Sequence, residues 1–486
     1  MKILFIYSLD DTQSVLKPLR SLTSIQFGIS YISSLLHEHN FQTQLLVLGS
    51  NNHWKHSVKL LQKYMKNYAP KLVCFTAVSS QYPFINKIAS FIKTNWSDKY
   101  LIIGGAHTTL NPTAVITDSF DALCIGEGEY PLLELCHQIE TKQTPHGIAN
   151  LWIKRPDGTI ERNLTRPFHE NLDDLPFPDR AMWEPWMKEH LGSELAVLLG
   201  RGCPYNCTYC CNHVLKKAAP GKYVRMRSPE GIIKEIATIH KEYPNQQRIY
   251  FEVESIALNK DWLLEYCRQL EDFNSTINNS ILYSSNFRIS PQSMDEKIFV
   301  GFKKANIYKI NIGLEAGSER IRRKVLKRDY SNKDFLDVVS MARKYGLKIY
   351  IFNMIGLPGE TYNDYMETVS LNRQIQPDGH YTGIFFPYPG TELYNVCVSG
   401  NLIESTLKAR MERRQAMIDF PIFSKKQIQG AYTWFNYRVY KGYKPLWWIL
   451  MWTVLFKVTS IPLTNLLFRK IVRLPILRLV RTKFRH

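Results

Sequence analysis

The sequence predicts an α/β protein with three parts: a doubly wound, Rossmann-like N-terminal sheet, a partial (β/α)6 TIM-like barrel and a helical C-terminal region. Short apolar runs alternate with helical segments in two series along the 486 residues, and the second series has six units. This alternation is typical of parallel sheets covered by helices. The length exceeds one ordinary domain, and we expect the parts to be 1–140, a linker at 141–190, 191–404 and 405–486.

The first part carries five strand signals. Ile25–Leu36 has helical spacing and ends at His39–Asn40, and a second helical stretch runs to Lys93. Because ligands of doubly wound sheets bind beyond the carboxyl ends of the strands, the glycine-rich segments there are candidate binding loops. The expected strands are Lys2–Ser8, Thr43–Leu48, Lys71–Thr76, Tyr100–Ile103 and Ala122–Ile125.

The second series follows a less regular stretch. Residues 173–179 are rich in Pro and Asp, a composition that favours a linker. Six βα units in some two hundred residues then predict a partial barrel related to the (β/α)8 architecture. Its expected strands are Glu194–Leu199, Arg248–Val253, Ile281–Phe287, Ile307–Leu314, Leu347–Met354 and Tyr381–Phe386.

The C-terminal region is basic and apolar. Leu446–Phe456 is a continuous apolar run, and Ile461–Phe468 is a second one after Lys457. The first run is shorter than the roughly 18 residues of a spanning helix, so we expect peripheral attachment to the inner face of a membrane. Packing of its tryptophans onto the barrel is the alternative. No nucleic-acid reader motif accompanies the charge, which argues against nucleic acid.

Bulk properties favour a globular cytoplasmic protein. The net charge is +19, and the nine cysteines are not spaced like a secreted disulfide scaffold. The N-terminus lacks the basic lead and cleavage site of a signal peptide. A reducing compartment with metal-bound thiolates is therefore expected.

Three cysteines stand close together in the segment GRGCPYNCTYCCNH at 200–213. A compact loop with the spacing Cys203-x3-Cys207-x2-Cys210 can wrap three thiolates around one cluster and leave a fourth iron open. A zinc site that adds Cys211 or His213 is the alternative, although no second C-x2-C pair is present.

This segment resembles the signature of the radical S-adenosylmethionine (SAM) superfamily, in which an aromatic residue precedes the third cysteine, as Tyr209 does here. The segments Gly313–Ser318, Gly356–Thr361 and Phe386–Thr391 resemble later motifs of the family, in the expected order. The resemblance implies that SAM chelates the open iron of a 4Fe–4S cluster. The cluster ligands would be Cys203, Cys207 and Cys210.

Further SAM contacts follow from the same resemblance. Glu252 or Glu254 would face the SAM amino group, where the family often has aspartate. Asn286, Arg288 and Glu315 would line its ribose and carboxylate. A structural ion pair is the alternative role of Arg288 and Glu315.

The N-terminal part resembles the cobalamin-binding domain that precedes the barrel in one class of these enzymes. The glycines of its loops would let backbone approach a bulky ligand. Ser8–Asp11 lacks the histidine that ligates cobalt in other cobalamin proteins, so cobalamin would bind without a lower imidazole. His107 is a candidate substitute, with a loop hydrogen bond as the alternative; a domain that binds nothing is the alternative for the whole. The loop residues assigned by resemblance are Gly104, Gly105, His107, Gly126, Glu127 and Gly128.

Together these resemblances imply a radical SAM enzyme. Reduced flavodoxin or ferredoxin would supply an electron, SAM cleavage would give a 5′-deoxyadenosyl radical, and cobalamin would carry a methyl group to an unactivated carbon. The substrate would be a small molecule, and the apolar tail favours a lipid or a hydrophobic natural product. A cobalamin-dependent cyclase, a non-catalytic cobalamin or iron–sulfur sensor, and a zinc-stabilised RNA-modifying protein are the alternatives.

Overall fold

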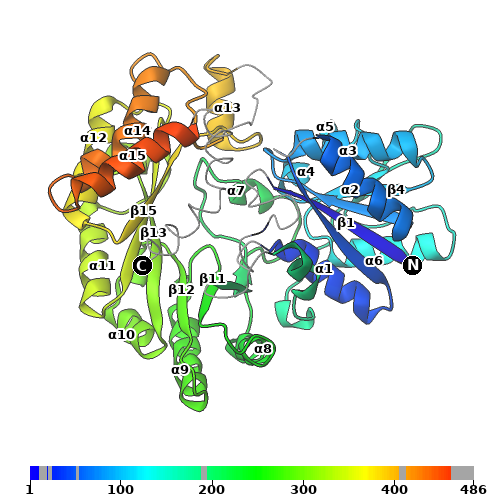
Figure 1. Cartoon of the computed structure of the whole chain (residues 1–486), viewed down its shortest axis with the longest axis horizontal. Coiled ribbons are helices and arrows are strands. Elements are labelled where there is room, and N and C mark those ends of the chain that lie inside the picture. Colours follow the sequence, from blue (N-terminus) through cyan, green and yellow to red (C-terminus); the bar gives the residue numbers. More distant parts are fainter. Residues whose placement is uncertain (10–18, 20–24, 51–53, 188–193, 404–411, 461–486) are drawn as a thin grey trace. The chain divides into compact units, whose positions relative to one another are not determined.

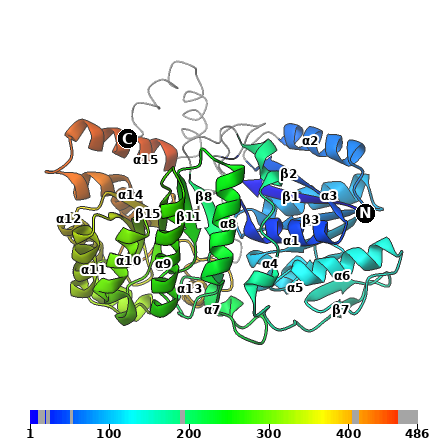
Figure 2. The same cartoon turned by 90° about the horizontal axis from the view of Figure 1, so that it is seen from below.

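The computed structural model describes residues 1–9, 19, 25–50, 54–187, 194–403 and 412–460. The chain forms two compact units, whose elements appear in Figures 1 and 2. Each unit is built from segments that are distant in sequence. The first comprises Met1–Arg288, Asp295–Ile310 and Tyr388–Thr391, and the second Ile289–Met294, Asn311–Pro387 and Glu392–His486.

A seven-stranded sheet forms the N-terminal part of the first unit, with the order β2-β1-β3-β4-β5-β6-β7. Strands β1 to β5 pair in parallel, and β6 and β7 are antiparallel. The strand order reverses direction between β1 and β3, so a ligand site is expected beyond their carboxyl ends. The strands are β1 (Lys2–Leu9), β2 (Gln42–Gly49), β3 (Leu72–Thr76), β4 (Tyr100–Gly104), β5 (Ala122–Cys124), β6 (Leu151–Lys154) and β7 (Ile160–Arg162).

Six helices accompany these strands among the described residues. Helix α1 begins where Gln26 Oε1 accepts a hydrogen bond from Ile29 N at 2.7 Å, and its buried side includes Leu35 and Leu36. Helix α2 and the hairpin β6–β7 were not among the expected elements. The helices are α1 (Phe27–Glu38), α2 (Trp54–Asn67), α3 (Tyr82–Asn95), α4 (Ala106–Leu110), α5 (Pro112–Val115) and α6 (Glu129–Glu140).

The stretch expected to be a linker is tied to its surroundings by side-chain hydrogen bonds. Trp183 Nε1 donates to Ser30 Oγ at 2.8 Å, and Trp186 Nε1 donates to the Leu45 carbonyl at 3.1 Å. Arg180 donates to the Ala196 carbonyl at 2.9 Å. Short turns of η2 (Leu172–Asp174) and η3 (Ala181–Trp186) lie within it.

A six-stranded sheet has the order β15-β14-β13-β12-β11-β8, which confirms the predicted partial barrel. The pairings β8–β11, β11–β12 and β14–β15 are parallel. Strand β15 begins and ends two residues earlier than expected, because Gly379 already pairs with Tyr350 and Ile384 ends the register. The strands are β8 (Leu195–Leu198), β11 (Arg248–Glu252), β12 (Leu282–Phe287), β13 (Ile307–Glu315), β14 (Lys348–Ile355) and β15 (Gly379–Ile384).

The helices of this part alternate with its strands. Ser331 and Thr361 begin α11 and α12 with reciprocal hydrogen bonds to Asp334 and Asp364, the capping arrangement that satisfies the first backbone N–H groups. The helices are α7 (Asn212–Leu215), α8 (Pro229–Glu242), α9 (Lys260–Thr276), α10 (Glu296–Lys304), α11 (Asn332–Lys344), α12 (Tyr362–Ile375) and α13 (Glu392–Ser399), and the short elements are β9 (Gly200–Arg201), β10 (Arg225–Met226), η4 (Pro291–Met294) and η5 (Ile321–Val325).

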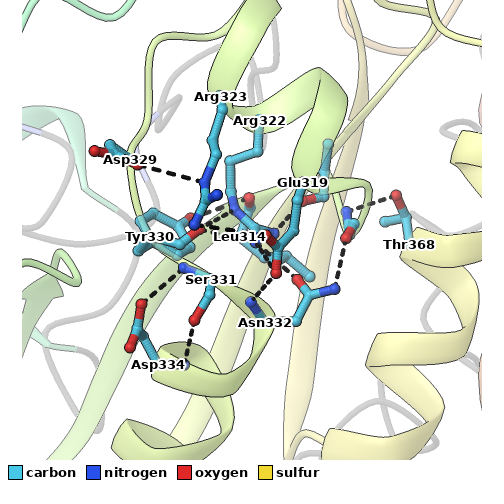
Figure 3. A network of polar contacts seen from close by, with 12 residues as sticks. Leu314, Glu319, Arg322, Arg323, Asp329, Tyr330, Ser331, Asn332, Asp334 and Thr368 are labelled. Carbon is cyan, nitrogen blue, oxygen red and sulfur yellow. Dashed lines mark hydrogen bonds and ion pairs between the residues drawn. The ribbon is translucent and has the colours of Figure 1, made fainter.

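A buried arginine fixes the turn after β13 (Figure 3). Arg322 is fully buried and donates to the carbonyls of Ala316 at 2.8 Å and Tyr330 at 3.0 Å. It also donates to Asn332 Oδ1 at 2.7 Å, and Asn332 Nδ2 donates to the Gly317 carbonyl at 3.1 Å. Backbone carbonyls of the Gly313–Ser318 segment are therefore held by side chains from the following loop.

The C-terminal region contains α14 (Lys425–Tyr440) and α15 (Leu446–Ser460). The ring of Trp448 packs edge-on against that of Tyr440, with centroids 5.4 Å apart. No helix among the described residues is long and apolar enough to cross a membrane. The second apolar run and the basic residues beyond it, 461–486, lie outside the described residues, as do Asp10 and Asp11.

Candidate cofactor site

The cysteine loop begins at a glycine that no other residue could replace without strain. Gly202 has φ +86°, and a Cβ there would overlap the Tyr223 carbonyl. This turn directs the chain from β9 into Cys203. Within the loop, Cys210 N donates to the Cys207 carbonyl at 3.1 Å. The loop therefore has a defined backbone conformation around its three thiols.

The three thiols share charged neighbours. Burial, followed by the charges of Glu254 and Cys207, raises the pKa of Cys203 to about 11, against a lowering by Arg288. A hydrogen bond from Cys211 lowers the pKa of Cys210 to about 7, while burial and Glu254 oppose this. Glu254 thus acts on the thiols at both ends of the loop, and Cys207 acts on Cys203.

Arg288, at the end of β12, reaches the middle cysteine. Its Nη1 lies 3.0 Å from Cys207 Sγ, and its guanidinium stacks over the Tyr205 ring at 3.7 Å. A cation next to a thiol favours the thiolate, which is the form that binds metal. Arg288 Nε is buried and has no hydrogen-bond partner among the described residues.

No three His, Cys, Asp or Glu side chains among the described residues are close enough together to hold a single metal ion. A cubane cluster separates its thiolate ligands more widely than one ion does, and the thiol-rich, partly buried donor set fits such a cluster.

The expected SAM residues lie in both units. Glu252 ends β11, and burial together with Glu254 raises its pKa to about 7. Asn286, on β12, donates to the Val253 carbonyl at 3.2 Å. Glu315 belongs to the second unit, where it ends β13 with φ +62° and accepts from Arg328 at 3.2 Å.

A cavity of about 380 Å³ lies in the first unit, at the carboxyl ends of β3, β4 and β5. Five of the six expected loop residues line it. Residues on both sides of the cysteine loop line it too, so the cavity joins the two predicted cofactor regions. The lining includes Gly104, Gly105, Gly126, Glu127, Gly128, Arg201, Gly202, Tyr223 and Arg225.

Its glycines form a cradle for a ligand. Gly105 has φ +93°, and a Cβ there would lie 2.5 Å from Thr76 Oγ1. Gly126 has φ +78°, and among the described residues a Cβ there would meet only Asn150 Nδ2 within 4 Å, at 3.6 Å. Backbone can therefore approach a bulky ligand at this edge of the sheet.

A partly buried charge cluster connects this cradle to the cysteine loop. Glu127 accepts from Arg201 at 2.9 Å, from Arg225 at 2.9 Å and from His169 N at 3.0 Å. Burial alone would raise the pKa of Glu127, but the Arg225 hydrogen bond and the Arg201 charge lower it to about 2. Arg201 also donates to Glu129 at 2.6 Å. We call Glu127, Glu129, Arg201 and Arg225 the Glu127 cluster.

His107 is not among the residues that line the cavity. Its Nδ1 lies 3.1 Å from Ser79 Oγ, and its ring packs on Tyr82 with centroids 4.2 Å apart. Burial lowers the pKa of His107 to about 4. These contacts correspond to the loop hydrogen bond that the sequence left open.

Arg201, Tyr223 and Arg225 line the cavity but were not among the residues expected from the sequence. Arg201 stands between two glycines just before Cys203, and a charged residue in so constrained a segment was the one available signal. Arg225 reaches the site because β10 pairs with β9 antiparallel, with Arg225 opposite Arg201. No pattern in the local sequence predicts the pairing of β9 with β10.

Comparisons with known proteins agree with this geometry. Residues 197–371 match the radical SAM superfamily, and residues 21–136 match the B12 binding domain. The chain contains a radical SAM domain and a B12-binding domain. The cofactor set that this pairing implies is the expected one: a 4Fe–4S cluster, SAM and cobalamin.

Similar sequences include enzymes of two kinds. An uncharacterised methyltransferase of Pyrococcus horikoshii is 25% identical over 406 residues, which cover 83% of this chain and 84% of that protein. An anaerobic magnesium-protoporphyrin IX monomethyl ester cyclase of Rubrivivax gelatinosus is 24% identical over 341 residues, 67% of this chain and 58% of the relative.

Solved structures share the fold of this chain. The radical SAM methyltransferase TsrM of Kitasatospora setae, solved with cobalamin and a 4Fe–4S cluster bound, matches with a TM-score of 0.64 at 16% identity. The match covers 83% of this chain and 79% of TsrM. The fold is thus found in a protein that holds both cofactors.

Proposed function

We propose that this chain is a cobalamin-dependent radical SAM methyltransferase that acts on an unactivated carbon of a hydrophobic or natural-product substrate. The cavity carries this proposal, because the glycine loops of the B12-binding domain and the residues beside Cys203 line the same space. A methyl carrier bound in the cradle would lie beside the loop that holds the cluster.

Cys203, Cys207 and Cys210 would hold the cluster, which supplies the electron that cleaves SAM into methionine and a 5′-deoxyadenosyl radical. Gly202 directs the chain into the first ligand, and Arg288 offers a cation to the second. Three protein thiolates leave one iron open for the amino and carboxylate groups of SAM.

Four other side chains would position SAM. Glu252 or Glu254 would accept from its amino group, and Asn286 and Glu315 would contact the ribose. Arg288 can serve the SAM carboxylate only if its guanidinium leaves Cys207, where it lies in the structure. The Nε of Arg288 is buried, has no partner among the described residues, and is a further donor for the SAM carboxylate.

Cobalamin would occupy the glycine cradle, where it supplies the methyl group. Gly104, Gly105, Gly126 and Gly128 would give it backbone contact. The Glu127 cluster would hold the loop after β5 against the strand that leads to Cys203. The described part of the cavity wall contains no histidine, so these residues would offer no imidazole to cobalt.

Two partners complete the proposal. A reduced flavodoxin or ferredoxin would deliver the electron. The chain would attach peripherally to the cytoplasmic face of a membrane, which agrees with a lipid or other hydrophobic substrate.

A cobalamin-dependent cyclase or rearrangement enzyme is the second candidate. The 24% identity to the Rubrivivax gelatinosus cyclase supports it. A cyclase would consume SAM as a source of the radical alone, whereas a methyltransferase would also form S-adenosylhomocysteine when SAM donates its methyl group.

Anaerobic reconstitution with iron, sulfide and hydroxocobalamin tests the proposal. After reduction with dithionite and addition of methyl-labelled SAM, we expect 5′-deoxyadenosine, S-adenosylhomocysteine and label in the cobalamin fraction. The matched control is Cys207→Ala, which should still bind hydroxocobalamin but form no 5′-deoxyadenosine. A wild-type protein that holds zinc, or one that holds both cofactors and never cleaves SAM, would contradict the proposal.

A further inference from the structure

Helix α15 presents an apolar face to solvent. Leu446, Leu450 and Val454 recur every four residues and are 57%, 41% and 59% exposed. Trp447 and Met451 stand beside them at 58% and 42% exposure. Residues four apart lie on the same side of a helix. We call these five residues the α15 stripe.

The other side of α15 is packed against the protein. Ile449 and Thr453 are buried, and Trp448 contacts Tyr440 of α14. Figures 1 and 2 show α15 lying along α14. The helix is therefore attached through one face, and the α15 stripe is left on the opposite face.

The surrounding sequence carries one sign of charge. Residues 420–486 contain 13 Lys or Arg and no Asp or Glu, although the whole chain has 43 acidic residues. Lys441 and Lys444 precede the stripe and Lys457 follows it, and all three are exposed. Apolar side chains bordered by lysines suit the boundary between acyl chains and anionic headgroups.

We propose that the α15 stripe is the surface through which the chain binds an anionic phospholipid bilayer. The five side chains enter the boundary between headgroups and acyl chains, and the flanking lysines face lipid phosphates. This inference deepens the proposed membrane attachment and is independent of the proposed reaction. Since no described helix can span a bilayer, α15 lies along the surface.

Vesicle flotation of the full chain tests the inference. The vesicles contain phosphatidylcholine alone or with added phosphatidylglycerol, and the variant is Leu450→Glu with Val454→Glu. We expect the wild type to float with anionic vesicles and the variant to bind about tenfold or more weakly. The free energy gained by burying one aliphatic side chain exceeds the free energy that corresponds to a tenfold change in affinity. Added salt should weaken the binding of the wild type to anionic vesicles.

The matched control is Val396→Glu, a 44% exposed valine on α13 of the same unit. It should float like the wild type. Unchanged thermal unfolding and hydroxocobalamin binding show that a variant is folded, and neither measurement requires turnover.

Three outcomes would overturn the inference. The double variant could float as well as the wild type, or the wild type could ignore anionic vesicles. Sedimentation could also show a wild-type dimer that the double variant converts to a monomer without vesicles, which would make a second copy the partner. SAM cleavage, measured separately, would be unaffected by any of these results.

Discussion

Arg201 donates to Glu127 across 2.9 Å and so joins the strand before the cysteine loop to the loop after β5. Arg225 donates to the same carboxylate from β10 and is only 3% exposed. Glu127 therefore pairs with two arginines, one on each strand of the β9–β10 pair, and Glu129 supplies a second carboxylate to Arg201. Because these residues line the cavity, loss of the Glu127 carboxylate should disturb both stability and cofactor binding.

Glu127→Gln should lower the free energy of unfolding by about 2 kcal/mol, because it leaves Arg225 buried without a charged partner. Denaturant titration measures this change, and hydroxocobalamin affinity should fall with it. Glu134→Gln is the control, since Glu134 is 49% exposed and pairs with Arg166 at the surface. That change should cost less than about 1 kcal/mol. If both variants lost the same free energy of unfolding, the Glu127 cluster would stabilise the protein no more than a surface ion pair does.

The lowered pKa of Glu127 predicts that the protein loses stability in acid. The pKa of Glu127 falls from 4.5 to about 2 on folding, so the folded state binds its proton less readily than the unfolded state does. Its contribution is therefore present above pH 4.5 and is lost as the pH falls through about 2. Unfolding followed across this range should show a shallower pH dependence for Glu127→Gln than for the wild type.

Cys210→Ala should abolish the cluster, whereas the neighbouring Cys211→Ala should keep it. Both thiols are half-buried and they hydrogen-bond to each other, so the two variants are closely matched. The measurements are iron per protein after anaerobic reconstitution and the absorption of thiolate-bound iron. Full iron content in Cys210→Ala, or loss of iron in Cys211→Ala alone, would show that Cys210 is not the third cluster ligand.

Much of the fold was predictable because its strands are short, apolar and separated by helices. Strands such as β1, β3 and β8 are mostly buried, so an apolar run is enough to identify them. The hairpin β6–β7 was missed because it lies at the edge of the sheet, where only alternate residues of β6 are buried and no residue of β7 is buried. Strand β15 was placed two residues late because Phe385 and Phe386 continue its apolar run beyond the last paired residue.

The site was predictable only where its residues are neighbours in sequence. The cysteine loop and the glycines at the ends of β4 and β5 form local motifs. Arg225 joins Glu127 through strand pairing and burial, and a single sequence records neither. The contact of Arg288 with Cys207 likewise depends on how β12 ends relative to the loop.

Gly104→Leu should block cobalamin with little loss of stability. A Cβ on Gly104 would lie 3.7 Å from the Cβ of Cys124, another cavity residue, which is an ordinary contact. The rest of a leucine would extend into the space that the ligand needs. Titration with hydroxocobalamin should show an affinity at least about tenfold weaker. Gly104→Ala is the control and should bind nearly as the wild type; identical affinities for Leu and Ala would exclude this edge from the site.

Arg322 and Arg323 are adjacent in sequence and opposite in environment, which provides a further test (Figure 3). Arg322 is fully buried and makes four hydrogen bonds to the turn after β13 and the loop that follows, whereas Arg323 is 47% exposed and contacts Glu319 and Asp329. Arg322→Met would leave the carbonyls of Ala316 and Tyr330 without their donors and should lower the free energy of unfolding by about 3 kcal/mol. Arg323→Met should change it by less than about 1 kcal/mol, because exposed ion pairs contribute little. Since Glu315 precedes this turn, Arg322→Met should also weaken SAM binding in equilibrium dialysis; normal SAM affinity in a folded Arg322→Met protein would separate the turn from the SAM site.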